Sequence, residues 1–312
     1  MLQVERPALI VYVRAGFSLD GPDMTLDTSS YKIPVARTVA DLRATIADWR
    51  KQGLNVGLVP TMGALHDGHL SLVDLVKTKT DRCVVSIFVN PTQFAPHEDL
   101  DAYPRTEAAD AAKLTGRGDL IFAPNAAEMY PAGYSTTINL TGVTGPLEGE
   151  ARPTHFAGVA TVVAKLLLQA LPNVAAFGEK DWQQLQVIRR MVADLNIPVE
   201  IIGGAILREA DGLAMSSRNV YLTADERKAA GQLNIILRDT AAEVAAGKTI
   251  SAATAEGSKR ILALGFAHVD YLEVRDAASL AAFDADEATG GARILVAAKI
   301  GKTRLIDNMP VG

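Results

Sequence analysis

Two histidines and two glycines in the segment Pro60–His69 form the part of the chain best suited to chemistry. Gly63 and Gly68 have no Cβ, so the backbone there can approach a phosphate group closely. His66 and His69 are three residues apart, so a helical turn would place their rings side by side. Imidazoles donate hydrogen bonds to phosphate oxygens and can carry positive charge. The segment therefore predicts a phosphate-binding site.

The flanking sequence places this segment between a strand and a helix. The apolar run Leu54–Val59 predicts a buried strand, and the apolar positions of Leu70–Val76 fit one helical face. A turn from strand to helix presents backbone N–H groups and a helix dipole to an anion. It is not a P-loop, because His69 and Leu70 follow Gly68 where a P-loop has Lys and Ser or Thr. The alternative is a helix start whose histidines act as surface caps.

A second polar group follows the next expected strand, Cys83–Val89. Asn90 and Gln93 offer neutral donors and acceptors at a strand's carboxyl end, where ligands bind in open α/β sheets. Such amides suit a compact, hydroxylated acid. An Asx turn before Pro91 is an equally good explanation of Asn90 alone.

A third group follows the expected strand Val174–Phe177. Gly178 again permits close backbone approach, and Asp181 is placed to cap the following helix. Lys180 and Gln184 are four residues apart and would share one helical face. Lys180 is a candidate phosphate ligand, although a solvated lysine would explain it without this context.

A fourth group lies in the loop that follows the expected sheet. Ser216 and Ser217 provide two hydroxyls, and Arg218 provides a delocalised cation suited to phosphate oxygens. Gly212 marks a turn, so the loop is a candidate to close over a nucleotide. A serine-rich helix entry is the alternative. Elsewhere, Arg152 and His155 are candidates to point into the cleft, but His155 fits a core or capping role slightly better.

The composition is that of an ordinary globular enzyme. The 312 residues are 48% hydrophobic and 21% charged, with a net charge of −5. No global basic field exists to attract nucleic acid. The single cysteine, Cys83, excludes an intramolecular disulfide and is expected to be buried and inert. No uninterrupted apolar stretch of membrane-spanning length and no clean signal-peptide layout appear, so the cytoplasm is the expected location.

The remaining pattern predicts an α/β fold. Strands alternate with helices, which indicates a Rossmann-like, doubly wound parallel sheet covered on both faces. The expected strands are Leu54–Val59, Cys83–Val89, Asp119–Ala123, Val174–Phe177 and Val199–Ile202. Five helices are expected with these strands. The first runs from Thr38 to about Gln52, three others begin near Gly68, Arg105 and Asp181, and the fifth is the buried helix Phe156–Leu171.

After about residue 206 the expected strands and helices no longer alternate. Thr223–Glu226 reads as a capping box for one long helix to about Ala246, followed by a helix over Ser251–Leu264. Three strand-like runs without helices between them predict a small antiparallel sheet. They are His268–Val274, Ala292–Ala298 and Thr303–Ile306. We therefore expect three parts: a flexible extension over 1–33, a Rossmann-like ATP- and substrate-binding domain over 34–206, and a C-terminal α+β lid domain over 207–312. Within the extension, Met24 is a candidate start of the protein.

Known motifs match these groups. His66-Asp67-Gly68-His69 resembles the His-x-Gly-His signature of the nucleotidylyltransferase superfamily. Six segments, in order along the chain, resemble the pantoate–β-alanine ligase (pantothenate synthetase) family. They are Val59–His69, Ser86–Phe94, Asp99–Thr106, Arg152–Phe156, Phe177–Gln184 and Arg208–Asn219. The resemblance runs from about residue 34 to the C-terminus; the first 33 residues exceed the usual start of the family.

This resemblance implies an activity and a set of site residues. The family uses ATP to join (R)-pantoate to β-alanine through pantoyl adenylate, releasing AMP and pyrophosphate. His66 and His69 would contact the phosphates, with His69 at the position of the family's proton donor. Lys180 and Arg218 would neutralise charge in the transition state. Gln93 and Gln184 would contact pantoate, with Gln93 also near β-alanine. The implied ATP contacts are Met62, Gly63, Ala64, Leu65, His66, Asp67, Gly68, His69, Gly178, Glu179, Lys180, Asp181, Leu207, Met215, Ser216, Ser217 and Arg218.

The resemblance also implies Mg²⁺ bound mainly by phosphates and water, with no dedicated protein ligands, and a homodimer. Two alternatives stay open. Another nucleotidylyltransferase would share the two histidines but need not have Asn90, Gln93 and Gln184. A non-catalytic adenine-nucleotide sensor would bind ATP without releasing pyrophosphate. The acidic net charge disfavours a tRNA synthetase.

Overall fold

A computed structural model of the chain describes residues 28–96 and 98–312. Residues from Tyr31 to Gly312 form one compact unit. Most of the extension expected over 1–33, and Met24 as a start, lie outside the described residues. The expected division at residue 206 into two domains stays a prediction. None of the described helices is long and apolar enough to cross a membrane.

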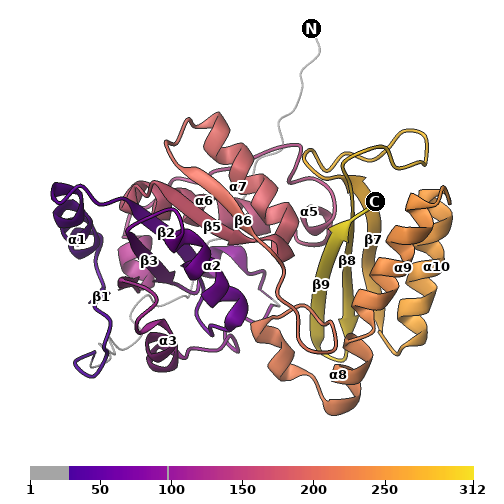
Figure 1. Ribbon diagram of the computed structural model, residues 1–312, viewed down its shortest axis with the longest axis horizontal. Helices are drawn as coiled ribbons and strands as arrows, with labels where there is room; N and C mark the ends of the chain where they lie inside the picture. Colours follow the sequence, from indigo (N-terminus) through magenta and orange to yellow (C-terminus); the bar gives the residue numbers. More distant parts are fainter. Residues whose placement is uncertain (1–27, 97) are drawn as a thin grey trace, which may run out of the picture. The chain divides into compact units, whose positions relative to one another are not determined.

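The expected parallel sheet is present, with six strands in the order β1-β4-β3-β2-β5-β6 (Figure 1). All five pairings are parallel. The strands are β1 (Val35–Ala36), β2 (Val56–Thr61), β3 (Arg82–Ile87), β4 (Leu120–Phe122), β5 (Val174–Gly178) and β6 (Glu200–Gly204). From β2 the chain first builds outward through β3 and then crosses to β5 on the other side. The strand order therefore reverses between β2 and β5, and ligands bind at such a switch point.

Helices cover both faces of this sheet. One face packs against α1 (Val39–Lys51), α6 (His155–Ala170) and α7 (Trp182–Asp194). The other packs against α2 (Asp67–Lys77) and α3 (Glu107–Leu114). Neighbouring residues of a strand point to opposite faces, so Leu58 and Val59 enter different cores. Two short helices, α4 (Ala126–Met129) and α5 (Glu148–Ala151), and strand β1 are additional to the sequence expectation.

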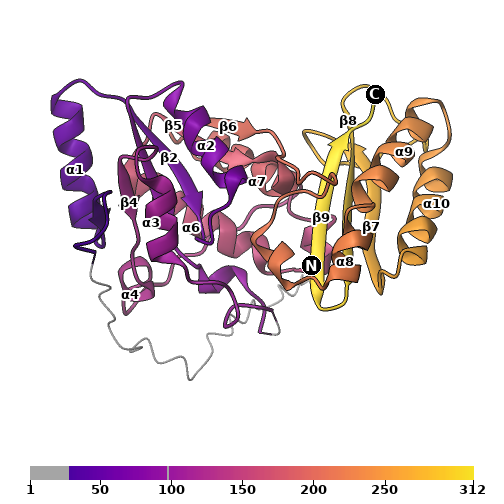
Figure 2. The same cartoon turned by 60° about the horizontal axis from the view of Figure 1, so that its bottom comes forward.

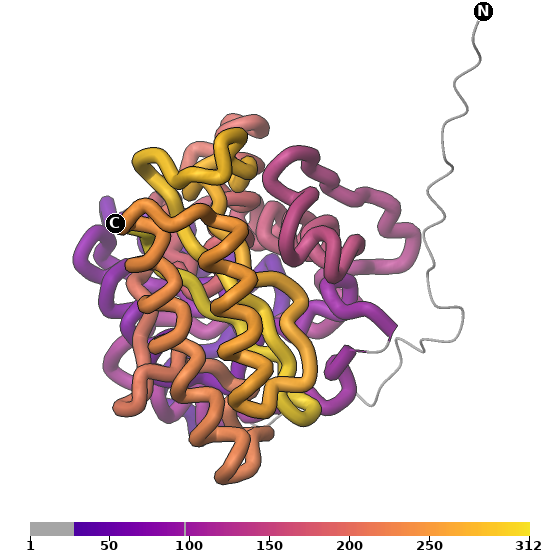
Figure 3. The backbone as a smooth tube through the Cα atoms, turned by 90° about the vertical axis from the view of Figure 1, so that its right-hand side faces the viewer, coloured from indigo at the N-terminus to yellow at the C-terminus, as the bar shows by residue number. Residues whose placement is uncertain are grey.

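The C-terminal region contains the expected antiparallel sheet, in the order β7-β8-β9. Its strands are β7 (His268–Asp276), β8 (Ala292–Ile300) and β9 (Thr303–Pro310). Helices α9 (Leu233–Ala245) and α10 (Ile250–Ala263) lie side by side over one face of it (Figures 2 and 3). Thr223 and Glu226 do form a capping box.

The single long helix expected from Thr223 to Ala246 is wrong. The structure has α8 (Ala224–Ala230) and α9, separated at Gly231 and Gln232. A Cβ on Gly231 would lie 2.6 Å from a carboxylate oxygen of Asp211. The carboxylate of Asp211 also pairs with Arg227 of α8. The break therefore lets the 208–214 turn pack close to the helix backbone, a tertiary contact that periodicity does not reveal.

Candidate active site

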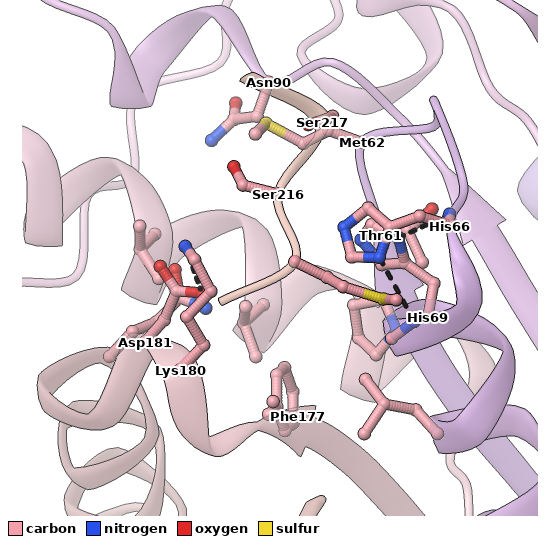
Figure 4. A pocket seen from close by; sticks show the side chains of 18 of the residues that line it. Thr61, Met62, His66, His69, Asn90, Phe177, Lys180, Asp181, Ser216 and Ser217 are labelled. Atoms are coloured by element: carbon pink, nitrogen blue, oxygen red, sulfur yellow. Dashed lines mark hydrogen bonds and ion pairs between the residues drawn. The ribbon is translucent and has the colours of Figure 1, made fainter. Parts of the chain in front are cut away.

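One pocket lies at the carboxyl ends of β2, β3 and β5 and is also lined by residues 205–207 and 215–218 (Figure 4). It collects all four polar groups singled out in the sequence. The predicted site residues that line it are Met62, His66, Gly68, His69, Gln93, Gly178, Lys180, Asp181, Gln184, Leu207, Met215, Ser216, Ser217 and Arg218. Gly63, Ala64, Leu65, Asp67 and Glu179 are not among the lining residues. In Figure 4, His66 and His69 lie on one side of the pocket and Lys180 and Asp181 on the other.

Backbone N–H groups of the turn that contains both histidines hold the two rings in place. The N–H of Gly68 donates to Nδ1 of His66 over 3.2 Å, and the N–H of His66 donates to Nδ1 of His69 over 3.3 Å. The ring centroids are 4.1 Å apart. His66 is therefore the N-cap of α2, as the capping interpretation predicts, and it also lines the pocket, so phosphate binding stays a prediction for it.

These contacts decide the charge and tautomer of both rings. Burial, together with the Lys180 charge, lowers the pKa of His66 to about 4, and burial, together with the neighbouring His66 and Lys180, lowers the pKa of His69 to about 3. At neutral pH both rings are therefore uncharged. Since each Nδ1 accepts a hydrogen bond, each proton resides on Nε2. Both side chains can therefore donate through Nε2–H to an oxygen in the pocket.

A buried carboxylate shapes the loop before the histidines. Gly63 and Ala64 have φ of 83° and 51°, so two successive residues adopt left-handed backbone. Asp110 of α3, which is fully buried, accepts hydrogen bonds from the N–H groups of Ala64 and Leu65 over 2.9 and 2.8 Å. Asp110 thus compensates for an unfavourable conformation that only Gly63 tolerates without strain.

Gln93 is held at both ends. Its side-chain Oε1 accepts from Nδ2 of Asn90 over 3.1 Å. Its backbone carbonyl accepts from Arg152 over 3.3 Å, and Nδ1 of His155 lies 3.0 Å away. Burial, with the nearby Arg152 charge, lowers the pKa of His155 to about 4, so neutral His155 donates from Nδ1. Arg152 in turn pairs with Glu98 over 2.6 and 2.7 Å.

Arg152 and His155 therefore do not line the pocket but support a residue that does. This agrees with the non-chemical role favoured for His155. Asn90 caps a short 3-10 helix (Pro91–Gln93), as the turn explanation predicts, and it also lines the pocket, so its contact with an acid ligand stays a prediction.

The backbone at Lys180 is hydrogen-bonded to the C-terminal sheet. Asn308 of β9 donates to the carbonyls of Glu179 and Lys180 over 3.0 and 2.8 Å. Asp181 occupies the N-cap position of α7, but its side chain makes no capping hydrogen bond. Instead its carboxylate lies 3.9 Å from the Lys180 ammonium. The expected capping role of Asp181 is therefore wrong, because the carboxylate faces the pocket cation.

The loop that carries Ser216, Ser217 and Arg218 forms another side of the pocket. Ser216 caps a 3-10 helix (Ser217–Tyr221) by accepting from the N–H of Arg218. The Arg218 guanidinium makes two hydrogen bonds to Asp99, and it lies 5.6 Å from the ring centroid of Tyr103. The hydroxyls of Tyr103 and Ser217 are 3.2 Å apart. The loop is thereby tied to residues 99–103.

Sequence comparison assigns the chain to a family. The family model for pantoate-beta-alanine ligase matches residues 34–310. The chain belongs to the pantoate-beta-alanine ligase family. A pantothenate synthetase of Rhodospirillum rubrum is 56% identical over 280 residues, which cover 89% of this chain and 99% of that protein.

Solved structures of the ligase family have the same fold. The pantothenate synthetase of Thermus thermophilus has a TM-score of 0.84 and 44% identity, covering 89% of this chain and 99% of that one. The pantoate-beta-alanine ligase of Francisella tularensis, solved with beta-gamma ATP and beta-alanine, has a TM-score of 0.76 and 34% identity. It covers 89% of this chain and 97% of that one.

Sequence reasoning missed several residues that support this ligase-family site: Asp99, Tyr103, Asp110 and Asn308. Asp99 and Tyr103 lie within a segment that resembles the family but carry no pattern of their own. Asp110 had a usable signal, because it shares the buried face of α3 with Ala111 and Leu114. A buried carboxylate requires partners, which marks such a position. Asn308 had no signal in the sequence, since the carbonyls that it contacts lie over a hundred positions away in the chain.

Proposed function

We propose that this chain condenses (R)-pantoate with β-alanine, using ATP, to form pantothenate, AMP and pyrophosphate. The observation that carries the proposal is the convergence, in one pocket of a ligase-family chain, of neutral donors, two cations and three amides. The donors are His66 and His69, and the cations are Lys180 and Arg218. The donors and cations can bind the oxygens of a triphosphate, and the amides can bind a small hydroxy acid next to it.

In the first step a carboxylate oxygen of pantoate attacks the α-phosphorus of ATP, and the bond to the pyrophosphate oxygen breaks. Negative charge builds on the phosphate oxygens. We assign its stabilisation to the Nε2–H groups of His66 and His69 and to Lys180 and Arg218. Bound phosphates would raise the low pKa of His69, which suits the proton-donor role implied by its family position. Ser216, Ser217 and the surrounding loop residues would hold the nucleotide.

In the second step the amine of β-alanine attacks the acyl carbon of pantoyl adenylate. An amide bond forms, AMP leaves with the electron pair of the broken acyl–oxygen bond, and the ammonium loses a proton. Gln93 and Gln184 would orient the pantoyl group. This route works by positioning and charge neutralisation and needs no protein nucleophile. Cys83 fits that interpretation, because it is buried and burial raises the pKa of its thiol to about 12.

Mg²⁺ would enter with the triphosphate. The described residues contain no group of three or more His, Cys, Asp or Glu side chains placed to hold a metal. Asp181 is the only carboxylate among the described residues that line the pocket. One carboxylate together with phosphates and water fits Mg²⁺, which would neutralise phosphate charge. Asp181 is the residue we propose to approach it.

Four further proposals rest on the family and the sequence. We infer a homodimer, which light scattering at micromolar concentration would refute by returning the monomer mass. We infer a functional division near residue 206, supported by residues 215–218, which line the pocket but follow the main sheet in the chain. A closing motion of residues 207–312 and a cytoplasmic location remain predictions.

The test is pyrophosphate release from ATP and Mg²⁺ with and without D-pantoate and β-alanine. We expect pantoate-dependent release that turns over only with β-alanine and yields AMP and pantothenate. A nucleotidylated end product would favour another nucleotidylyltransferase. ATP binding without pyrophosphate release would favour a nucleotide sensor.

A further inference from the structure

The amide of Asn90 has one defined orientation in the structure. Its Oδ1 lies 3.4 Å from the backbone N–H of Thr92, which can only donate. Its Nδ2 lies 3.2 Å from the carbonyl oxygen of Gly158, which can only accept. A flipped amide would oppose like groups at both places. Because Asn90 is 1% exposed, water cannot compensate for such a mismatch.

The orientation of Asn90 dictates that of Gln93. Nδ2 of Asn90 is a donor, so the atom of Gln93 that it contacts at 3.1 Å must be the carbonyl Oε1. The NH₂ group of Gln93 is then on the other side, where its nitrogen lies 3.1 Å from Sδ of Met62. A thioether is a weak acceptor, so this NH₂ group keeps its capacity to donate. Both Gln93 and Met62 line the pocket.

Tyr130, which follows α4 and does not line the pocket, completes this arrangement. Its hydroxyl donates to Oδ1 of Asn90 over 2.7 Å, the shortest contact that Asn90 makes among the described residues. The Thr92 hydroxyl donates to the same oxygen over 2.9 Å. The Tyr130 ring is itself fixed, with the Tyr134 ring centroid at 5.1 Å and the Lys165 ammonium 5.9 Å from its own centroid.

We propose that Tyr130 is a positioning residue for the acid substrate: through Asn90 it holds Gln93 with its NH₂ group directed at the pocket. Gln93 then recognises a hydrogen-bond acceptor, a carboxylate or hydroxyl oxygen, and not a donor. The chain of donors runs in one direction, from Tyr130 to Asn90 to Gln93, so each bond polarises the next. Burial raises the pKa of Tyr130 to about 12, so its hydroxyl keeps the donated proton throughout the working pH range.

This inference rests on the proposed function, and the wild-type protein separates the two. If the wild type shows no pantoate-dependent pyrophosphate release, the proposed function fails. If it does, the comparison is between Tyr130→Phe and its matched control Tyr134→Phe. Each variant loses one hydroxyl and keeps its ring, but of these two tyrosine hydroxyls only that of Tyr130 has a described hydrogen bond to Asn90.

We expect Tyr130→Phe to raise the KM for pantoate roughly fivefold, the effect of one lost hydrogen bond, because Thr92 still donates to Asn90. The KM for ATP should stay within about twofold of wild type, and Tyr134→Phe should resemble wild type in both constants. Unchanged kinetics in Tyr130→Phe would overturn the proposal. An equal rise in both KM values would also overturn it, because that pattern indicates general loss of structure.

Asn90→Asp tests the same chain if Tyr130→Phe does not fold. Aspartate keeps the shape of Asn90 but cannot donate to Gln93, so the Gln93 amide should turn and present its oxygen to the pocket. We expect the KM for pantoate to rise on the order of fiftyfold, with that for ATP changed less than about threefold. Pantoate binding that tolerates this variant would refute the directed orientation of Gln93.

Discussion

The guanidinium of Arg218 forms a two-pronged ion pair with the carboxylate of Asp99, with N–O distances of 2.8 and 2.9 Å. The two residues are 119 positions apart in the chain, and Arg218 lines the pocket whereas Asp99 does not. Arg218 is therefore oriented before any phosphate arrives, and Asp99 balances its charge. A triphosphate would share or replace this partner.

Arg218→Ala should slow adenylation on the order of a hundredfold while the KM for pantoate changes less than about threefold, because Arg218 would act on developing phosphate charge. Single-turnover pyrophosphate release would measure the first effect. If only pantoate affinity fell, the assignment of Arg218 to the phosphates would be wrong.

Asp99→Asn should lower kcat/KM for ATP roughly three- to tenfold, because a neutral amide cannot replace the charged, two-pronged acceptor that orients Arg218. Asp101→Asn is the matched control, since Asp101 lies exposed in the same segment. Equal losses in both variants would point to the segment's net charge and not to the pair.

His69→Ala should reduce adenylation by a factor on the order of a hundred or more, because the variant lacks the Nε2–H donor. His268→Ala serves as the control, since His268 is exposed on β7 and is not among the pocket-lining residues. Near-normal turnover by the His69 variant would remove this histidine from the chemistry.

Gly158→Ala should damage the pantoate side of the pocket through packing alone. A Cβ on Gly158 would lie 2.4 Å from the backbone oxygen of Thr92 and 2.7 Å from the backbone nitrogen of Gln93. We expect about 1–3 kcal/mol less stability, together with a higher KM for pantoate. Chemical denaturation and steady-state kinetics would measure both. A fully stable, fully active variant would show that the 3-10 helix shifts freely.

Stability should fall as the pH drops from about 6.5 to 5. The folded-state pKa values of His69 and His155 are lowered to about 3 and about 4, so between these values and 6.5 the unfolded chain binds more protons. Each of these histidines would contribute a slope of at most about 1.4 kcal/mol per pH unit. Urea unfolding at several pH values gives the slope, and His155→Gln should make it shallower. A pH-independent free energy of unfolding in this window would contradict the lowered pKa values.

Local sequence patterns predicted most of the elements. The capping of α1 by Thr38 and the capping box at Thr223 were both correct, because a cap depends on residues within one turn. The strand ends were placed to within about two residues, except that β9 runs to Pro310 and not to Ile306, since alternating and apolar runs reflect burial directly. The short elements β1, α4 and α5 were missed because two to four residues carry no period.

The sequence alone determined which residue types stand at the ends of β2, β3 and β5, and it therefore predicted a site for a phosphate and a small acid at that edge. Parallel strands bring their carboxyl ends to one edge, so this followed from order along the chain. Only the tertiary structure decided the charge of the two histidines, the orientation of Gln93 and the pairing of Arg218. Those properties depend on burial and on partners such as Asp99 and Tyr130, which long-range packing supplies and no local pattern encodes.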